Sequence, residues 1–374
     1  MNLGAREKLL RPAFLLGVLA LFLSVPAAQG QTVNDLPPPP PAWKAKPTPT
    51  PKPPEDEKLD VIRTSSNLVM VPVSVTDQTG QAIQGLQVAD FRLLEEGRQQ
   101  EISGIGDPEQ VPLAIALLFD VSSSVSQKGF FASQQNAAAA FLKLVMKPVD
   151  RAAIFTITEE PTMIQPLATA ETSATKMLTI PAATKPVPTA FYDTVAAAAK
   201  YLADNAPSNF RRVIVVLSDG DDNFSNLIRE SIEETSAGKN EQPTPAETRT
   251  GLQQHHQRAV SEVQKAVQQA DVIFYSVNPG GPSVRLNQIS MRAEKGMEAI
   301  AEITGGTAFI PESDQELDKV FRQVAAELRG QYLLQYYANA QGPAGQFRRI
   351  QVAVPARNDV RVRARHVYYP KKED

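Results

Sequence analysis

Oxygen-bearing side chains follow directly after a wholly apolar run of the sequence. Leu113–Phe119 is the apolar run, and Asp120, Ser122 and Ser124 supply a carboxylate and two hydroxyls just beyond it. The run predicts a strand covered on both faces of a parallel sheet, and open parallel sheets bind ligands at the carboxyl ends of their strands. Oxygen ligands with few carboxylates suit Mg2+. The same pattern is also common at a helix N-cap, so this segment alone leaves both readings open.

Two other segments bring oxygen atoms to the same predicted edge of the sheet. Thr189 stands just before a predicted helix that begins at Phe191, and a second apolar strand, Val213–Ser218, leads into Asp219. Because the carboxyl ends of parallel strands share one edge, we expect these side chains to lie near Asp120. Together the three segments favour a metal site over a set of unrelated helix caps.

These three segments resemble the metal-ion-dependent adhesion site of a von Willebrand factor type A domain. That family has an Asp-x-Ser-x-Ser loop, a threonine before a helix and a distal aspartate at the end of a strand. The resemblance implies that the hydroxyls of Ser122, Ser124 and Thr189 bind the metal, Thr189 either directly or through water. It implies that the carboxylates of Asp120 and Asp219 hold the metal's water molecules.

The resemblance also implies the cofactor and the class of partner. The expected metal is Mg2+, with Mn2+ and Ca2+ as alternatives, and the expected partner is a protein that presents an Asp or Glu to it. Such a carboxylate would complete the coordination shell, so metal binding and partner binding should depend on each other. Ser123 and Pro188 stand where the family commonly has glycine, and neither position contributes a side-chain ligand.

Strands and helices alternate around these segments, which predicts an α/β fold with a doubly wound, mostly parallel sheet. The expected strands are Leu113–Asp120, Ala152–Glu159, Met163–Leu167, Val213–Ser218, Val272–Val277 and Thr307–Ile310. The expected helices are Ser133–Met146, Phe191–Asn205, Ala259–Ala270, Gly296–Ile303 and Asp314–Leu328. The polar stretches Glu230–Gln257 and Asn278–Arg292 are interpreted as surface insertions of uncertain order.

Alternating β patterns occur on both sides of this α/β block. Asn67–Thr76 and Phe91–Glu95 precede it, and strands within 331–337, 348–354 and 360–368 follow it. We expect the two ends to pair into a small β-sandwich-like region that flanks the Rossmann-like domain. With Gly85-Leu86, Asp90-Phe91, Leu94-Glu95-Glu96-Gly97 and Gly330-Gln331-Tyr332-Leu333-Leu334, this arrangement resembles the bacterial exported proteins called VWFA-related.

The amino-terminal segment predicts export from the cytoplasm. Basic residues lie ahead of an apolar stretch over 13–25, and small residues precede Gln31, which is typical of a secretory signal peptide. The alternative is an uncleaved segment that anchors the chain to a membrane. Prolines concentrate between Leu36 and Pro54 and predict an extended spacer. We therefore expect a secreted, periplasmic or cell-envelope location in a bacterium.

The expected organisation has five parts: signal peptide 1–30, proline-rich linker 31–58, β-rich region 59–110, von Willebrand factor A-like domain 111–329 and carboxy-terminal strands 330–370. The chain has no cysteine, which excludes a disulfide framework, and a formal net charge of -3, which does not favour nucleic acid as a partner.

Other clusters of polar residues receive weaker functional interpretations. The acidic run Asp219–Asn223 lacks the twelve-residue pattern of a calcium loop, and we interpret it as a solvated loop beside the predicted metal. His255 and His256 are interpreted as surface residues, because the chain has no cysteine and no suitably spaced partner for a zinc site.

The sequence leaves three functional classes open. The first is an exported, metal-dependent adhesion or interaction module without enzymatic activity. The second is a structural component of the envelope with a vestigial metal site. The third is a metal-assisted hydrolase, which we expect least because no histidine lies near the end of a predicted α/β strand.

Overall fold

The structure, a computed structural model, describes residues 68–122, 131–236, 245–282, 288–338 and 346–370. All of them belong to one compact unit, Arg63–Asp374. The predicted signal peptide and linker, and Ser123 and Ser124, lie outside the described residues. The side chains of residues 233–236, 245–249 and 314 are also outside the description.

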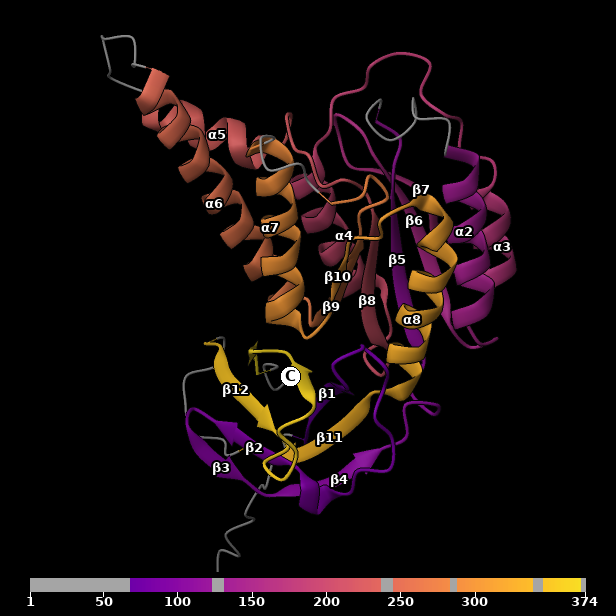
Figure 1. The fold of residues 1–374 in the computed structure, drawn as a ribbon, viewed down its shortest axis with the longest axis vertical. Helices are drawn as coiled ribbons and strands as arrows, with labels where there is room; N and C mark the ends of the chain where they lie inside the picture. The colour runs from indigo at the N-terminus through magenta and orange to yellow at the C-terminus, as the bar shows by residue number, and fades with distance from the viewer. Residues whose placement is uncertain (1–67, 123–130, 237–244, 283–287, 339–345, 371–374) are drawn as a thin grey trace, which may run out of the picture. The chain divides into compact units, whose positions relative to one another are not determined.

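A six-stranded sheet, ordered β10-β9-β8-β5-β6-β7, forms the centre of the α/β region (Figure 1). Its strands are β5 (Leu113–Asp120), β6 (Arg151–Ile157), β7 (Thr162–Ala168), β8 (Arg211–Leu217), β9 (Val272–Val277) and β10 (Ala308–Phe309). Every pair is parallel except β6 with β7, the antiparallel strand at one edge. The predicted doubly wound, mostly parallel sheet is therefore confirmed.

Helices cover both faces of this sheet (Figure 1). The helices are α2 (Phe131–Val145), α3 (Ala170–Met177), α4 (Phe191–Asn205), α5 (Asn226–Ser236), α6 (Pro245–Gln269), α7 (Gln288–Thr304) and α8 (Leu317–Gly330). Alternate residues of β5 point to opposite faces, as the two-residue period of a strand requires. Leu117 packs in a core cluster with residues of α2, α3 and α8, while Leu118 packs with residues of α4, α6 and α7.

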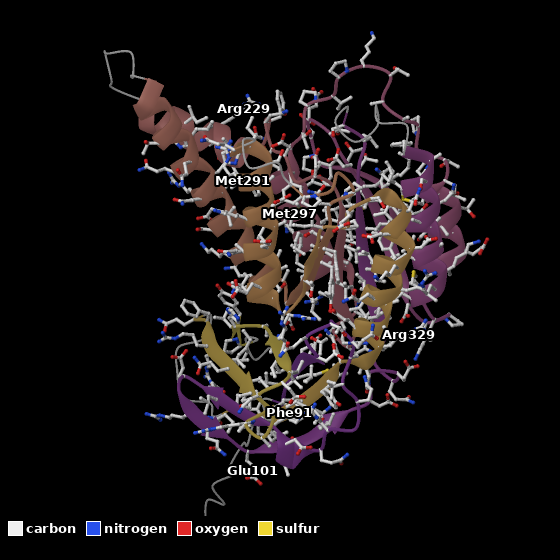
Figure 2. The ribbon with its side chains drawn as sticks, in the orientation of Figure 1. Phe91, Glu101, Arg229, Met291, Met297 and Arg329 are labelled. Carbon is white, nitrogen blue, oxygen red and sulfur yellow. The ribbon has the colours of Figure 1, made fainter. Side chains whose placement is uncertain are left out.

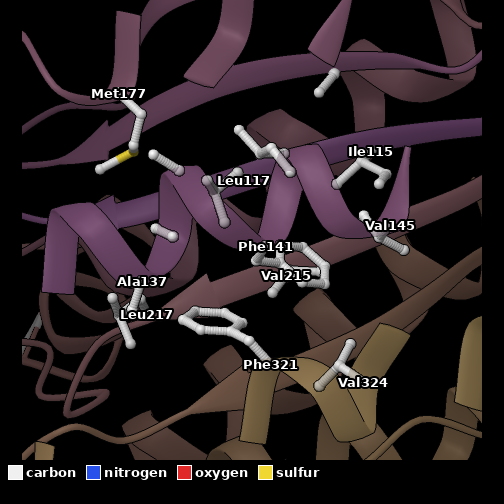
Figure 3. Close-up of a cluster of buried hydrophobic side chains, with 14 of the residues drawn as sticks. Ile115, Leu117, Ala137, Phe141, Val145, Met177, Val215, Leu217, Phe321 and Val324 are labelled. Carbon is white, nitrogen blue, oxygen red and sulfur yellow. The ribbon is translucent and has the colours of Figure 1, made fainter. Parts of the chain in front are cut away.

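The first of these two cores is closed by aromatic packing between helices. Figure 3 shows Phe141 of α2 and Phe321 of α8 beside Leu117 and Val215 of the sheet. The two rings stack with their centroids 5.0 Å apart. The buried apolar residues of α8 belong to the same cluster as residues of the sheet, so apolar packing holds this helix against the sheet and against α2.

Strands from both ends of the chain pair with each other. One antiparallel sheet has the order β13-β1-β11-β4 and the other the order β14-β12-β2-β3. Their strands are β1 (Leu68–Thr76), β2 (Arg92–Glu95), β3 (Arg98–Gln100), β4 (Ile102–Gly106), β11 (Tyr332–Tyr337), β12 (Arg348–Ala353), β13 (Arg361–Ala364) and β14 (Val367–Tyr368). The predicted pairing of both ends is present in the two sheets, whereas the boundaries at residues 111 and 329 stay predictions.

Two polar stretches differ from the expectation of uncertain order. Glu230–Gln257 contributes to α5 and to the first half of α6, and Asn278–Arg292 includes the beginning of α7 at Gln288. The expectation was wrong for these helical residues, because the parts of α5, α6 and α7 within the two stretches are mostly polar and give only a weak helical period. Helix α3 was not predicted; it begins after Thr169, whose side chain accepts a hydrogen bond from the Thr172 amide.

Candidate metal site

The candidate site lies where β5 and β8 end side by side. The two strands are parallel neighbours with Phe119 opposite Leu217, so Asp120 and Ser218 follow at the same edge of the sheet. Both side chains are fully buried. A carboxylate is rarely buried without strong partners, because removing its charge from water is costly.

Ser122 and Ser218 donate hydrogen bonds to the Asp120 carboxylate. The Ser122 amide donates to Oδ1 at 2.7 Å, and the Ser218 hydroxyl donates to Oδ2 at 2.5 Å. Burial, followed by the negative charge of Asp219, raises the pKa of Asp120 to about 6. The carboxylates of Asp120 and Asp219 are thus close enough to repel each other, which is an arrangement that a cation would relieve.

Asp219 occupies the turn that follows β8. It is half-buried, and its Oδ1 atom accepts a 3.3 Å hydrogen bond from the Asp221 amide. In the described part of the chain its other carboxylate oxygen accepts none. The next residue, Gly220, has φ of +73°, and a Cβ there would lie 2.7 Å from the end of the Met297 side chain. Met297 is labelled on α7 in Figure 2, so glycine at 220 lets the turn approach this helix.

Thr189 is held beside this turn by its backbone. Its amide donates to Asn223 Oδ1 at 2.9 Å, and its carbonyl accepts from the amides of Asn223 and Phe224 at 3.0 and 3.1 Å. The residue is 4% exposed. Its hydroxyl makes no hydrogen bond to any described residue, so this oxygen remains available to a ligand.

Asp222 fastens the turn to helix α4. Its carboxylate accepts hydrogen bonds from the Tyr192 amide at 2.8 Å and the Ser225 hydroxyl at 2.5 Å. The side chain is buried, and burial raises its pKa. The interpretation of 219–223 as a solvated loop was therefore wrong for Asp222, because the first turn of α4 covers it.

The structure brings most of the predicted ligand set together. Asp120 and Ser122 are consecutive parts of one buried turn, Asp219 interacts electrostatically with Asp120, and Thr189 is tied to the turn after Asp219. Ser124 lies outside the described residues. Coordination of a metal by this set stays a prediction.

Three supporting residues escaped prediction from the sequence: Ser218, Asp222 and Asn223. Their roles depend on neighbours from another strand or helix, namely Asp120, Tyr192 and Thr189. The one feature of the sequence that could have indicated them is their position, since all three follow a buried apolar strand. Hydroxyl, carboxylate and amide side chains at such a strand end are natural partners for exposed backbone groups.

His256 also departs from its interpretation as a surface residue. Its side chain is buried on α6 at 7% exposure, with its ring 6.0 Å from that of Tyr192 in an edge-on arrangement. Burial, then Arg292, then His255 lowers the pKa of His256 to about 4. The neighbouring His255 is half-buried, and its Nδ1 lies 2.8 Å from the Ser231 hydroxyl.

The described residues contain no group of three or more His, Cys, Asp or Glu side chains that could hold a metal ion. The candidate site is consistent with this, because it combines two carboxylates with hydroxyl groups. None of the described helices is both long and apolar enough to cross a membrane.

No family model matches the sequence, and neither does any curated protein. Similar solved structures include a von Willebrand factor type A protein from Catenulispora acidiphila, at 12% identity over 81% of this chain and 75% of that chain (TM-score 0.42). Another is the vWF domain of the type V pili tip protein Mfa5 from Porphyromonas gingivalis, at 12% identity over 57% of this chain and 94% of that chain (TM-score 0.37).

A third similar structure is proximal thread matrix protein 1 from the mussel byssus, with a zinc-occupied MIDAS motif. Its identity is 15% over 61% of this chain and 48% of that chain (TM-score 0.39), so the present chain spans about half of its length. These neighbours are von Willebrand factor A domains, the family that the sequence motifs resemble. The sheet order and the helices on both faces, described above, define the Rossmann-like fold of this chain on their own.

Proposed function

We propose that this protein is an exported interaction module that uses a divalent metal to capture an acidic side chain of a partner protein. The observation that carries the proposal is that the parallel neighbours β5 and β8 end side by side and lead into Asp120 and Asp219 at one sheet edge. At this edge, the hydroxyl of the buried residue Thr189 and one carboxylate oxygen of Asp219 make no hydrogen bond in the described part of the chain.

The donor set fits a hard divalent cation. Ser122, Ser124 and Thr189 would bind Mg2+ through their hydroxyls, while Asp120 and Asp219 would hold its water molecules. Oxygen-only ligands suit Mg2+, which retains water in protein sites; Mn2+ and Ca2+ are the alternatives. The metal supplies a positive centre to which a carboxylate from outside can bind.

The carboxylates and the hydroxyls would act differently at this site. Asp120 and Asp219 provide the negative charge that attracts the cation, while the neutral hydroxyls leave part of its charge uncompensated. A partner's Asp or Glu would then complete the coordination shell. Metal and partner should consequently strengthen each other's binding, because each contributes free energy only when the other is present.

The proposed module has four parts along the chain. Residues 1–30 would direct export, 31–58 would form a spacer, and 59–110 with 330–370 would form the β-rich support for 111–329. A protein arranged in this way would present its binding edge at or beyond the cell envelope.

Affinity capture from an envelope extract of the native host tests the proposal. Wild-type protein should retain a partner in millimolar Mg2+ and release it in EDTA, and renewed Mg2+ should restore capture. Thr189→Val should lose capture, because valine has a similar shape but no hydroxyl. The matched control is Thr179→Val, whose exposed hydroxyl only bonds the Lys176 carbonyl. Capture that survives both EDTA and Thr189→Val would refute the proposal.

A further inference from the structure

A cavity of about 480 Å³ lies at the opposite edge of the central sheet, where the parallel strands begin. Arg211 and Arg212 open β8 there, and Val272 opens β9. Residues of the carboxy-terminal β region, among them Arg365 and Tyr368, complete the lining. The volume is in the range of pockets that hold small organic ligands.

Four arginines line this cavity: Arg211, Arg212, Arg348 and Arg365. Two of them have carboxylate partners. Arg348 pairs with Glu95 at 2.6 Å, and Arg365 pairs with Asp271. Arg211 and Arg212 form no ion pair with a carboxylate among the described residues, although Asp150 and Glu109 lie near enough to Arg211 to stabilise its charge. Arg212 is therefore the cationic group to consider.

The carboxyl-terminal ends of two helices also lie beside the cavity. Helix α6 ends at Gln269 and α7 at Thr304, both beside the cavity. Each carboxyl-terminal end contributes roughly half a negative charge. These ends offset part of the charge of Arg212, so the feature left for an anion is the set of hydrogen-bond donors on this guanidinium.

Arg212 is the arginine best suited to receive an anion. One terminal nitrogen donates a 2.9 Å hydrogen bond to the Ala270 carbonyl, and the other makes none to any described residue. Arg211, by contrast, is occupied by the Leu328 and Pro108 carbonyls and by Gln331. A guanidinium with free donors binds carboxylate, sulfonate or phosphate oxygens well, because its charge strengthens each hydrogen bond.

The rest of the lining is largely apolar. Leu68, Pro72, Ile273 and Tyr368 contribute hydrocarbon or ring surface to the cavity. A small inorganic anion would leave these surfaces in contact with water, whereas an organic anion would cover them. We infer that this cavity is a binding site for a small organic anion, whose acidic group contacts Arg212 and whose apolar body contacts the β-region side.

Binding of 8-anilinonaphthalene-1-sulfonate, measured by fluorescence in EDTA, tests the inference independently of the proposed metal site. The wild type should show one saturable site. Arg212→Met should weaken binding at least tenfold, and Arg92→Met, which removes an exposed arginine elsewhere, should have no effect. N-phenyl-1-naphthylamine, which has the same rings but no sulfonate, should bind at least tenfold more weakly than 8-anilinonaphthalene-1-sulfonate.

A second variant should change binding in the opposite direction. Asp271→Asn removes the carboxylate that pairs with Arg365, and asparagine tolerates the φ of 54° at this position. It should strengthen binding at least threefold. This variant tests anion binding in the cavity even if Arg212→Met fails to fold. The absence of a saturable site, or unchanged affinity in both variants, would overturn the inference.

Discussion

The Ser218 hydroxyl donates a 2.5 Å hydrogen bond to Oδ2 of Asp120, and this bond joins the ends of two neighbouring parallel strands. Ser218 Oγ also accepts a 2.9 Å hydrogen bond from the Gly220 amide. A single hydroxyl therefore orients both the buried carboxylate and the turn that contains Asp219. The candidate site depends on this bond for the relative placement of its two acidic groups.

Replacing Ser218 with alanine should destabilise the fold. The change leaves a buried carboxylate oxygen and the Gly220 amide without their partner, and an unsatisfied buried polar group costs about 1–3 kcal/mol. Urea unfolding measures the free-energy difference from wild type. Ser261→Ala is the control, because its exposed hydroxyl only bonds the Gln257 carbonyl within α6. Equal losses for the two variants would contradict this role of Ser218.

The pair Glu327–Arg363 should contribute strongly to the attachment of α8 to β13. Glu327 Oε2 lies 2.8 Å from Arg363 Nη2, and the glutamate side chain is only 2% exposed. Glu327→Gln would leave the arginine without its counter-charge, at a cost of about 3 kcal/mol. Calorimetric unfolding measures this loss. The exposed pair Lys200–Asp204 is the comparison, and Asp204→Asn should cost under about 1 kcal/mol.

His256 should make stability depend on pH between about 4 and 6.5. Its pKa in the folded state is lowered to about 4 from an ordinary 6.5, so the unfolded chain binds a proton across this window and the folded chain does not. Its contribution to stability is therefore complete above pH 6.5 and lost as pH falls towards 4, by an amount on the order of 2 kcal/mol.

The variant His256→Phe isolates this contribution, because phenylalanine keeps an aromatic ring beside Tyr192 but does not titrate. Unfolding free energies of both proteins should be measured from pH 4 to 7. The difference between wild type and variant should grow in favour of the wild type as pH rises. A constant difference across the range would show that His256 does not titrate as described.

Gly306 should tolerate no side chain, because an added Cβ would lie 1.9 Å from the Phe274 carbonyl oxygen. The backbone after α7 would have to move away from β9, so Gly306→Ala should destabilise the protein by about 3 kcal/mol. At Gly104 the nearest atom to an added Cβ is 3.8 Å away, which is an ordinary contact. Thermal unfolding should therefore show a much smaller change for Gly104→Ala.

The sequence pattern predicted the elements that carry a strong apolar period. β5 was expected at its observed bounds, Leu113–Asp120, and α4 likewise at Phe191–Asn205. β5 is buried throughout and α4 buries one face, so their patterns are clear. The first half of α6 has a mostly polar sequence, and α6 contacts α5, with His255 Nδ1 2.8 Å from the Ser231 hydroxyl; no local pattern reveals this contact.

The main residues of the candidate site could be predicted from the sequence, but the residues that hold them in place could not. Asp120 and Asp219 each follow an apolar strand, and parallel pairing alone brings such strand ends together. Asp222 is different, because its buried carboxylate is held by hydrogen bonds from the Tyr192 amide and the Ser225 hydroxyl. Such contacts depend on where α4 begins in space, and sequence spacing does not determine that position.

Titration of Mn2+ into the metal-free protein, followed by electron paramagnetic resonance, tests the central claim most directly. We predict one bound Mn2+ per chain that Mg2+ displaces, loss of at least tenfold in affinity in Thr189→Val and in Asp219→Asn, and unchanged affinity in the control Thr179→Val. Binding that is absent in the wild type, or equally strong in all four proteins, would contradict the assignment of this sheet edge as a metal site.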